Sequence, residues 1–180
     1  MDNGASSYRR YLNGDEEAFG DIVKEYFDNL VFFIDGYVHD YAASEDIALD
    51  AFTQLVVNKK RYNFSVSLKT YLFMLGRSRA LDYLKHKKKL HMVELSEAME
   101  TASPDPGPEA QLLETEQKRA VHRAMAQLPE EMRMVLHLVY FEQLSAEEAG
   151  KVLKKSRKSV YNLLYRAKNA LRDILGKELV

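Results

Sequence analysis

The stretch that decides the fold is LPEEMRMVLHLVYFEQLSAEEAGKVLKKSRKSVYNLLYRAKNALRDIL, which runs from Leu128 to Leu175. Within it, Ser145 and Glu148 have the spacing of a capping box, in which a hydroxyl and a carboxylate satisfy the open backbone N–H groups of a new helix. A short helix is therefore predicted to begin at Ser145. It ends near Lys154-Lys155, and the hydroxyl of Ser156 is suited to cap a second helix. The sequence thus predicts two helices joined by a tight turn.

The second of these helices has an apolar stripe and a basic face. The stripe recurs at helical spacing and comprises Val160, Leu164, Ala167, Leu171 and Ile174. The residues off the stripe are of the types that contact phosphates and base edges in a major groove, and they are Arg157, Lys158, Ser159, Tyr161, Asn162, Tyr165, Arg166 and Lys168. The alternative is a solvated charged face on an ordinary helical hairpin, and the pattern alone does not decide between the two.

Several short motifs in this stretch occur in a characteristic order. They are Leu128-Pro129-Glu130-Glu131, Leu144-Ser145 with Glu147-Glu148, Ser159-Val160 and Tyr165-Arg166-Ala167-Lys168. In this order they resemble the domain of bacterial RNA polymerase sigma factors that binds the minus-thirty-five promoter element, and most nearly the small extracytoplasmic-function (ECF) group of the sigma-70 family. Two positions depart from that pattern. Lys154-Lys155 replace a common Gly followed by an apolar residue, and Leu163 replaces a frequently basic residue.

Composition is ordinary for a soluble globular protein. The 180 residues are 46% hydrophobic and 29% charged, and none is cysteine. No export signal or bilayer-spanning run is visible, so we expect a cytoplasmic protein without membrane insertion. The five histidines are scattered without metal-ligand spacing, and no glycine-rich phosphate loop is present. We therefore expect no catalytic site, no metal and no cofactor, and the protein is predicted not to be an enzyme.

Charge is unevenly distributed along the chain, although the net charge is only −1. A basic segment from Lys69 to His91 contains Asp82 as its only carboxylate, and a second basic segment begins at Lys151. Between them, Met92 to Glu116 contains acidic residues and no Lys or Arg. This alternation is typical of two DNA-contacting modules joined by a connector that does not contact DNA.

The N-terminal half has its own helical pattern. Residues 1–13 are interpreted as a loose lead or a partial turn. Helices are predicted from about Glu16 to near Asp35, from Ser44 to about Lys59 after a break near Ala42-Ala43, and from Ser67 to about Lys88. The loop at 60–67 places aromatic side chains beside the basic helix, a combination that suits single-stranded DNA. The alternative is that Tyr62 and Phe64 fill a gap between helices.

A second resemblance covers this half. Its motifs are Ser44-Glu45-Asp46, Ala51-Phe52, Ser67-Leu68-Lys69-Thr70-Tyr71-Leu72, Arg77 and Ala80-Leu81-Asp82-Tyr83-Leu84-Lys85, and they are similar to the promoter-melting domain of the same sigma factors. The resemblance implies three groups of site residues. Asp46, Asp50, Gln54 and Asn58 would bind core RNA polymerase. Arg61, Tyr62, Asn63 and Phe64 would hold an unstacked minus-ten base. Lys69, Arg77, Arg79, Lys85, Lys87 and Lys88 would bind the DNA backbone nearby.

The whole chain is therefore predicted to be all-α, with two helical domains. They are 1–89, which would melt promoters and bind polymerase, and 109–180, which contains the helix-turn-helix; a flexible proline-rich linker, 90–108, joins them. In the second domain, helices are expected at about 109–127 and from Pro129 towards Phe141. The resemblance implies a transcription initiation factor whose partners are core RNA polymerase, promoter DNA and an anti-sigma protein. The alternatives are a dimeric helix-turn-helix regulator that acts without polymerase, and a helical adaptor that binds only proteins.

Overall fold

The computed structural model describes residues 4–94, 121 and 123–178, and within these ranges it is helical with no strand. The predicted all-α class is confirmed. The chain divides into two compact units, Met1–Asp105 and Pro106–Val180. Each unit has its own buried core, and the two are described separately below.

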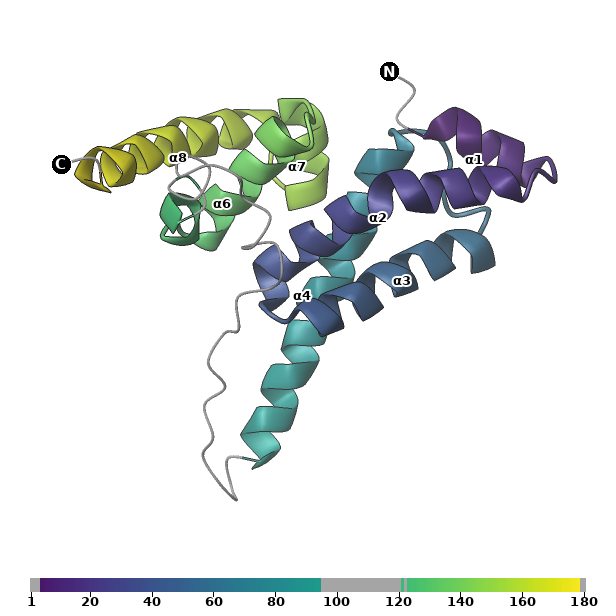
Figure 1. The fold of residues 1–180 in the computed structure, drawn as a ribbon, viewed down its shortest axis with the longest axis horizontal. Helices are drawn as coiled ribbons and strands as arrows, with labels where there is room; N and C mark the ends of the chain where they lie inside the picture. The colour runs from purple at the N-terminus through teal and green to yellow at the C-terminus, as the bar shows by residue number, and fades with distance from the viewer. Residues whose placement is uncertain (1–3, 95–120, 122, 179–180) are drawn as a thin grey trace. The chain divides into compact units, whose positions relative to one another are not determined.

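The first unit contains α1 (Ala5–Leu12), α2 (Glu17–Val38), α3 (Tyr41–Val57) and α4 (Leu68–Glu94) (Figure 1). Its core lies where α2, α3 and α4 pack together, and its fully buried side chains include Ile22, Leu30, Ile34, Leu55, Leu72 and Phe73. Gly76 lets α4 approach α2 closely, because a Cβ at this position would lie 2.7 Å from Leu30 Cδ1.

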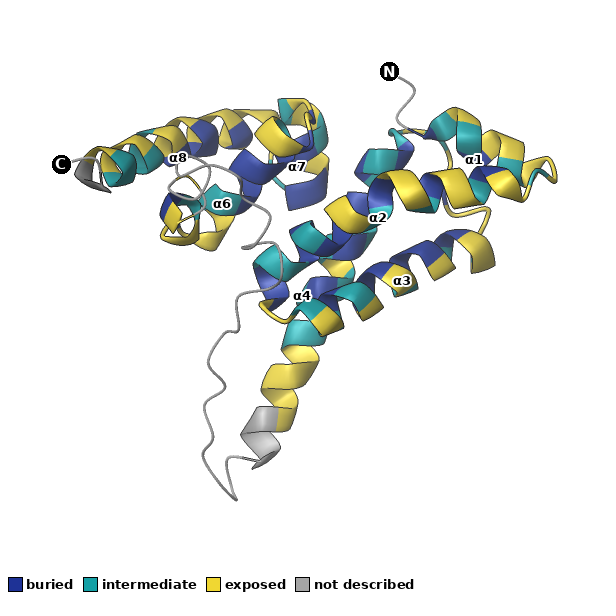
Figure 2. Cartoon of the chain, in the orientation of Figure 1, coloured by how far each residue is buried: buried dark blue, intermediate teal, exposed yellow. Residues whose placement is uncertain are grey.

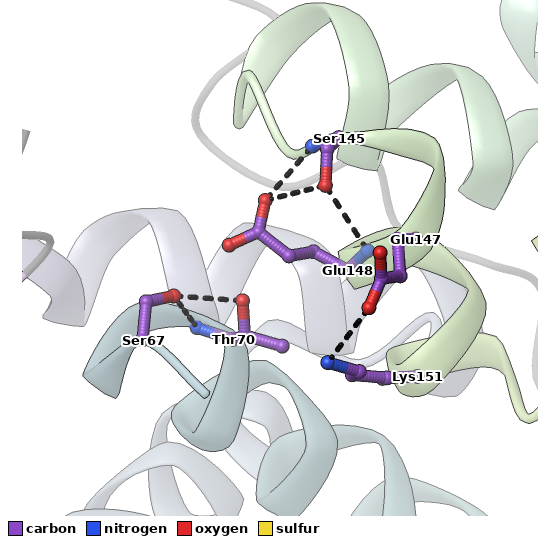
Figure 3. A network of polar contacts seen from close by, with 6 residues as sticks. All are labelled: Ser67, Thr70, Ser145, Glu147, Glu148 and Lys151. Carbon is purple, nitrogen blue, oxygen red and sulfur yellow. Dashed lines mark hydrogen bonds and ion pairs between the residues drawn. The ribbon is translucent and has the colours of Figure 1, made fainter. Parts of the chain in front are cut away.

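Polar side chains define where these helices begin. Asp15 Oδ1 accepts a hydrogen bond from Ala18 N at 3.3 Å, and Ser67 Oγ accepts one from Thr70 N at 3.1 Å (Figure 3). The predicted start of α3 at Ser44 is wrong. Asp40 caps this helix by accepting from Ala43 N at 3.1 Å, after His39 has turned the chain in the left-handed region with φ +53°. The break therefore precedes the predicted Ala42-Ala43.

Ser44 instead lies inside α3. Its buried hydroxyl donates to the Asp40 carbonyl at 2.7 Å, four residues back along the chain. A serine followed by acidic residues has the sequence of a helix start, and here that local signal is satisfied within the first turns of a helix that began earlier.

The N-terminal lead is also not loose. Residues Ala5–Leu12 form α1, in which the Tyr8 side chain is 0% exposed. The Tyr8 hydroxyl donates to the Leu55 carbonyl at 2.9 Å. Leu55 lies in the last turn of α3, where carbonyls have no partner within their own helix. Tyr8 thus ties α1 to the end of α3, just before the aromatic loop.

The last helix of this unit extends beyond its predicted end near Lys88 and continues to Glu94. Its first half is buried through Leu68, Leu72, Phe73 and Ala80, whereas residues from Lys85 to Leu90 are exposed (Figure 2). Residues 90–94 of the predicted linker are therefore helical, and 95–108 lie outside the described residues.

The second unit contains α6 (Glu130–Leu136), a π-helical turn η2 (His137–Phe141), α7 (Ala146–Leu153) and α8 (Arg157–Glu178). Of the helix predicted at about 109–127, residues 121 and 123–126 are described, and they are helical. Ala124 and Leu128 are buried, and Val121 is exposed. Gln127 lies in a turn, and residues 109–120 and 122 lie outside the described residues.

The capping box is present. Ser145 Oγ accepts from Glu148 N at 3.2 Å, and the Glu148 carboxylate accepts from Ser145 N at 3.0 Å (Figure 3). One helical turn further on, Lys151 Nζ lies 3.2 Å from Glu147 Oε1. Ser156 Oγ accepts from Ser159 N at 3.1 Å and so caps α8. The two helices predicted from the deciding stretch begin as expected.

The turn between α7 and α8 is tight although it has no glycine of its own. Lys154 adopts the left-handed conformation with φ +55°, and Lys155 N donates to the Gly150 carbonyl at 2.9 Å. A Cβ on Gly150 would lie 2.7 Å from the Lys155 carbonyl oxygen. The glycine that permits the turn therefore lies inside α7, at the point where the returning backbone crosses it. Lys155 also pairs with Glu131 on α6 at 2.9 Å.

A buried histidine and carboxylate support the residues before α7. His137 Nε2 lies 3.3 Å from Glu142 Oε1, and both side chains are almost fully buried. The His137 ring stacks on Phe141 with centroids 5.5 Å apart. No local pattern of residues indicates that these two polar residues pair inside the second unit.

Candidate nucleic-acid interface

The DNA-binding residues predicted on α8 lie on its exposed side. Each of them is exposed, while Val160, Leu164 and Ala167 are buried against the second unit (Figure 2). Tyr165 is 70% exposed, which is unusual for an aromatic side chain that serves only packing. The helix therefore presents the predicted cations, amide and phenols together along one face.

Contacts between neighbouring side chains hold them in place on this face. The Arg157 guanidinium donates to the Tyr161 hydroxyl at 3.5 Å and lies 5.6 Å from the centre of its ring. The hydrogen bond to Tyr161 raises the pKa of Arg157 above its ordinary value. Lys168 Nζ lies 5.1 Å from the centre of the Tyr140 ring. The charges thus stand over aromatic faces, where they remain open to solvent and to phosphate.

The position of Leu163 explains why an apolar residue is tolerated where the family pattern is frequently basic. Its side chain is 7% exposed, so this position belongs to the packing face of α8. An apolar residue replaces a basic one here without interrupting the row of exposed residues. The exposed face is therefore narrower than the family pattern implies, with Tyr161, Asn162 and Tyr165 at its middle.

The predicted base-holding residues of the loop do not share one environment. Arg61 and Asn63 are exposed and Phe64 is half-buried, but Tyr62 is only 3% exposed. The Tyr62 hydroxyl donates to the Val66 carbonyl at 2.8 Å, and its ring packs against Tyr8, Phe64 and Tyr71. In this structure Tyr62 supports the loop from beneath, which was the alternative interpretation for this residue.

Phe64 is the aromatic side chain of the loop that lies nearer the surface. Its backbone has φ +62°, an uncommon conformation for a bulky residue. Asn63 Oδ1 accepts from Ser65 N at 3.0 Å and closes the turn around it. The Phe64 ring lies 4.6 Å from the Tyr62 ring, and the Arg9 guanidinium lies 4.8 Å from its centroid.

The basic residues predicted along α4 fall into two groups. Lys85, Lys87 and Lys88 are exposed near its end. The other three are half-buried: Lys69 Nζ lies 5.9 Å from the Phe73 ring centre, Arg79 Nε pairs with Asp50 Oδ2 at 3.2 Å, and Arg77 lies between them in sequence. The pair of Arg79 with Asp50 joins two residues for which different partners were predicted.

The predicted polymerase-binding residues follow one side of α3. Asp46 is exposed, Asp50 is half-exposed, and Asn58 Nδ2 donates to Gln54 Oε1 at 2.9 Å. Asp46 and Asp50 also line an open hollow of about 670 Å³ between α3 and α4, together with Asp82 and His86. Among the described residues, no group of three His, Cys, Asp or Glu side chains is placed to hold a metal ion.

Sequence reasoning missed two features of these surfaces. The first is a set of exposed apolar residues on α3, Leu49, Val56 and Val57, the last of which is 69% exposed. Their helical spacing from the buried Ile47, Ala51 and Leu55 could have shown that Leu49 and Val57 lie off the buried side of α3. The second is Arg9, which no local signal linked to a loop more than fifty residues away.

Comparison with known proteins identifies the family. Residues 118–171 match the model of the family described as Sigma-70, region 4. Over nearly its whole length the chain is 27% identical to the ECF RNA polymerase sigma factor SigW of Bacillus subtilis, with 93% of this chain and 94% of SigW covered. Residues 118–171 therefore belong to the Sigma-70 region 4 family, and the chain as a whole is similar to ECF RNA polymerase sigma factors. These similarities support a role in transcription initiation with DNA binding through the helix-turn-helix.

A further relative and two solved structures are also similar to this chain. The chain is 26% identical to the RNA polymerase sigma-H factor of Pseudomonas aeruginosa, with 90% of this chain and 88% of that protein covered. Its fold is similar to that of the sigma factor RpoE, solved in complex with the anti-sigma factor NepR from Bartonella quintana, with a TM-score of 0.70, 16% identity, and 88% and 96% of the two chains covered. CnrH, solved with the cytosolic domain of CnrY, gives a TM-score of 0.68 at 18% identity, with 98% and 99% covered.

These two structural likenesses concern the fold alone. Within the described residues, no helix combines the length and the apolarity that crossing a bilayer requires.

Proposed function

We propose that this protein is a sigma factor that binds core RNA polymerase and directs it to promoters by using two separate DNA surfaces. α8 recognises the minus-thirty-five element as duplex, and the loop at 60–67 with the basic residues of α4 holds the minus-ten element once its strands separate. The observation that carries the proposal is the α8 surface, because every residue predicted to contact DNA is exposed there on a helix with a fixed cap.

The physical argument for duplex binding is the kind and order of the exposed groups. Cations such as Arg166 and Lys168 neutralise phosphates and release counterions, which supplies most of the affinity. Asn162 has the donor and acceptor needed for a base edge in the major groove. The capped turn before α8 fixes the helix in place, so these groups are presented without further ordering.

The argument for strand binding concerns Phe64 and its surroundings. A base that leaves the duplex loses stacking worth a few kcal/mol, and an aromatic ring can replace about 1–3 kcal/mol of it. Phe64 is partly exposed and its backbone is held in a strained conformation. Such strain is common at binding sites. Tyr62 is assigned a supporting role beneath Phe64, and Arg61 and Asn63 are the loop's exposed polar groups.

The α3 surface is proposed to bind the polymerase. Asp46, Asp50, Gln54 and Asn58 give it polar groups, and Leu49 and Val57 add exposed apolar area between them. A centre of apolar residues within a polar surround is the usual anatomy of a protein interface. An anti-sigma protein is proposed as a second partner, because RpoE, whose fold is similar, was solved in complex with the anti-sigma factor NepR.

The first experiment tests the assignment to polymerase. The protein is mixed with core RNA polymerase, the complex is purified, and transcription is measured from candidate promoters. We expect co-purification and promoter-dependent transcripts. If the protein instead binds two-fold symmetric duplex sites as a dimer and gives no transcript with polymerase, it is a helix-turn-helix regulator of the other class.

The second experiment tests the α8 surface by neutralising one charge. Arg166→Ala should weaken binding to promoter duplex and reduce the slope of log K against log salt by about 0.9, which is the contribution of one phosphate contact. The matched control is Arg172→Ala on the same helix, where Arg172 is exposed and already lies 3.7 Å from Asp173. Equal slopes for the parent and Arg166→Ala would remove Arg166 from the interface.

The third experiment separates strand holding from duplex binding. Phe64→Ala should leave duplex affinity unchanged and reduce the permanganate reactivity of unpaired thymines in the presence of polymerase. Phe64→Leu keeps an apolar side chain but removes the π-face, so it should behave like Ala, whereas Phe64→Tyr should retain opening. If promoters opened equally well with Phe64→Ala while the protein remained folded, Phe64 would serve packing alone.

A further inference from the structure

A residue of α1, outside every group of predicted DNA contacts, lies on the loop. The Arg9 guanidinium is 4.8 Å from the centroid of the Phe64 ring. Arg9 itself is exposed, so it covers the ring from the solvent side. The Tyr62 ring lies 4.6 Å away as a second neighbour from within the loop. Phe64 is thus bordered by one aromatic ring of the loop and one cation of α1.

The position of Arg9 is fixed by the residue next to it. Tyr8 is fully buried, donates to the Leu55 carbonyl at 2.9 Å, and packs its ring against Tyr62 and Phe64 at 5.4 and 6.2 Å. Since the backbone of Arg9 follows directly from this anchor, its side chain has the Phe64 ring within reach whenever α1 is in place. The loop and α1 therefore form one surface.

The charge of Arg9 differs from that of its neighbour. Arg10 Nη2 lies 2.6 Å from Asp15 Oδ2, and this contact lowers the pKa of the Asp15 carboxyl. Arg9 has no carboxylate partner among residues 4–94 of the structure, and its contact there is with the face of a ring. Lys59, just before the loop, makes a similar contact, with its Nζ 4.6 Å from the centroid of the Tyr11 ring in α1. Both cations remain able to bind a phosphate group.

We propose that Arg9 is part of the single-stranded DNA site. In the free protein its guanidinium occupies the face of Phe64 that a base will use. When the strand arrives, the base takes that face and Arg9 moves to an adjacent phosphate. A planar guanidinium is suited to both positions, because it stacks on aromatic rings and also forms bidentate contacts with phosphate. This inference rests on the proposed role of Phe64 and adds a residue from α1, the first helix of the unit.

The test uses the full chain with core RNA polymerase and a fluorescein-labelled promoter DNA whose minus-ten region is kept open by mismatches. Binding is measured over a series of salt concentrations. Arg9→Ala should weaken binding by about threefold to tenfold near 0.1 M salt and reduce the salt slope by about 0.7, the value for one contact to a single strand. Arg9→Lys should keep the slope, since the charge remains, but should not restore full affinity.

Arg10→Ala is the matched control, because it removes a neighbouring arginine that already has a carboxylate partner. We expect no change in slope for that variant. Arg9→Gln, which keeps a long polar side chain, is measured beside Arg9→Ala. Circular dichroism establishes that each variant is folded, and the conclusion is drawn from those that are.

Two results would overturn the proposal, and they are distinguishable. If Phe64→Ala weakens binding to the open DNA while Arg9→Ala and Arg9→Gln leave affinity and slope unchanged, Arg9 is not part of the site and the role of Phe64 survives. If Phe64→Ala has no effect either, the strand-holding function of the loop fails, and the inference fails with it.

Discussion

Lys154 shows how a single residue can keep a turn at a cost in stability. It ends α7 with φ +55°, a conformation in which a residue with a Cβ is disfavoured and glycine is the usual choice. The turn persists because the Lys155 N–H is satisfied by the Gly150 carbonyl and because Ser156 caps the helix that follows. The protein therefore has a position at which a substitution should increase stability.

Lys154→Gly is predicted to raise the free energy of unfolding of the second unit by about 0.5–1 kcal/mol, because glycine relieves the left-handed strain at a C-cap. Urea unfolding followed by circular dichroism is the measurement. Lys158→Gly, at an exposed position inside α8, serves as the control and should lower stability, since helical glycine costs up to about 1 kcal/mol. A loss of stability in both variants would mean that Lys154 is not strained.

The buried phenol of Tyr8 leads to a prediction about how stability depends on pH. Burial is the main cause that raises the pKa of this phenol from 10.0 to about 12. A group whose pKa is higher in the folded state contributes stability that is complete below its unfolded pKa and is lost as the pH rises through its folded pKa. The contribution of Tyr8 is therefore complete below about pH 10 and should decline between pH 10 and 12.

Tyr8→Phe removes the hydroxyl, so the variant lacks this decline. At pH 7 it should be less stable than the parent by about 1 kcal/mol, because the Leu55 carbonyl loses its donor. Urea unfolding of both proteins from pH 7 to 11.5 should show this difference narrowing above pH 10. A constant difference would indicate that the Tyr8 phenol titrates as it does in an unfolded chain.

Among the helices, α7 contains a glycine that permits the following turn although it lies inside the helix. Gly150 is buried, and a Cβ there would meet the Lys155 carbonyl oxygen at 2.7 Å. Because the obstacle is backbone, it cannot move aside as a flexible side chain would. Gly→Ala usually stabilises a helix interior, but here the steric conflict should outweigh the helix propensity of alanine.

Gly150→Ala is therefore predicted to destabilise the second unit by about 1–3 kcal/mol and to weaken duplex binding, since the turn that places α8 must shift. The control is Gly176→Ala in α8, where nothing lies within 4 Å of the added methyl group and stability should rise by up to about 1 kcal/mol. Thermal unfolding and duplex affinity are measured for both variants. If Gly150→Ala left the stability unchanged, the Lys155 backbone would lie further from Gly150 than the structure shows.

The elements that could be predicted from the sequence are those whose signals are local. The capping box at Ser145 and the cap at Ser67 involve residues three apart, and both helices begin there. The start of α3 was misplaced because Ser44 has the local sequence of a cap while Asp40 forms the bond. α1 was missed because its stability comes from Tyr8 meeting a carbonyl 47 residues away, which no short window contains.

The residues of the candidate DNA site divide in the same way, into those that local spacing predicts and those that it does not. Helical periodicity sufficed to place the residues of α8, because exposure on a single helix follows from spacing alone. It could not show that Tyr62 is buried and Phe64 accessible, since these two aromatic residues are separated by one position in an irregular loop. The pair formed by Arg79 and Asp50 likewise required the packing of α4 against α3 to be known.

At the scale of the molecule, each of the two compact units has a core of its own. Fragments Met1–Asp105 and Pro106–Val180 are therefore predicted to fold separately. Each should unfold cooperatively in urea, and their helical circular dichroism signals should add up to that of the whole chain. A fragment that lacks helix by itself would show that the proposed division into two domains is wrong. The intact chain measured under the same conditions is the reference.

The bond between Tyr8 and Leu55 also has a consequence for how the protein is made. A ribosome synthesises the chain from its amino end, so the first helix emerges long before the residues that hold it exist. During this interval Tyr8 and Tyr11 have no core to enter, and α1 must wait until α3 is complete and the loop beyond it has been released. The earliest residues of the chain are thus among the last of their unit to settle. A nascent chain can then contain finished helices and still lack a finished loop.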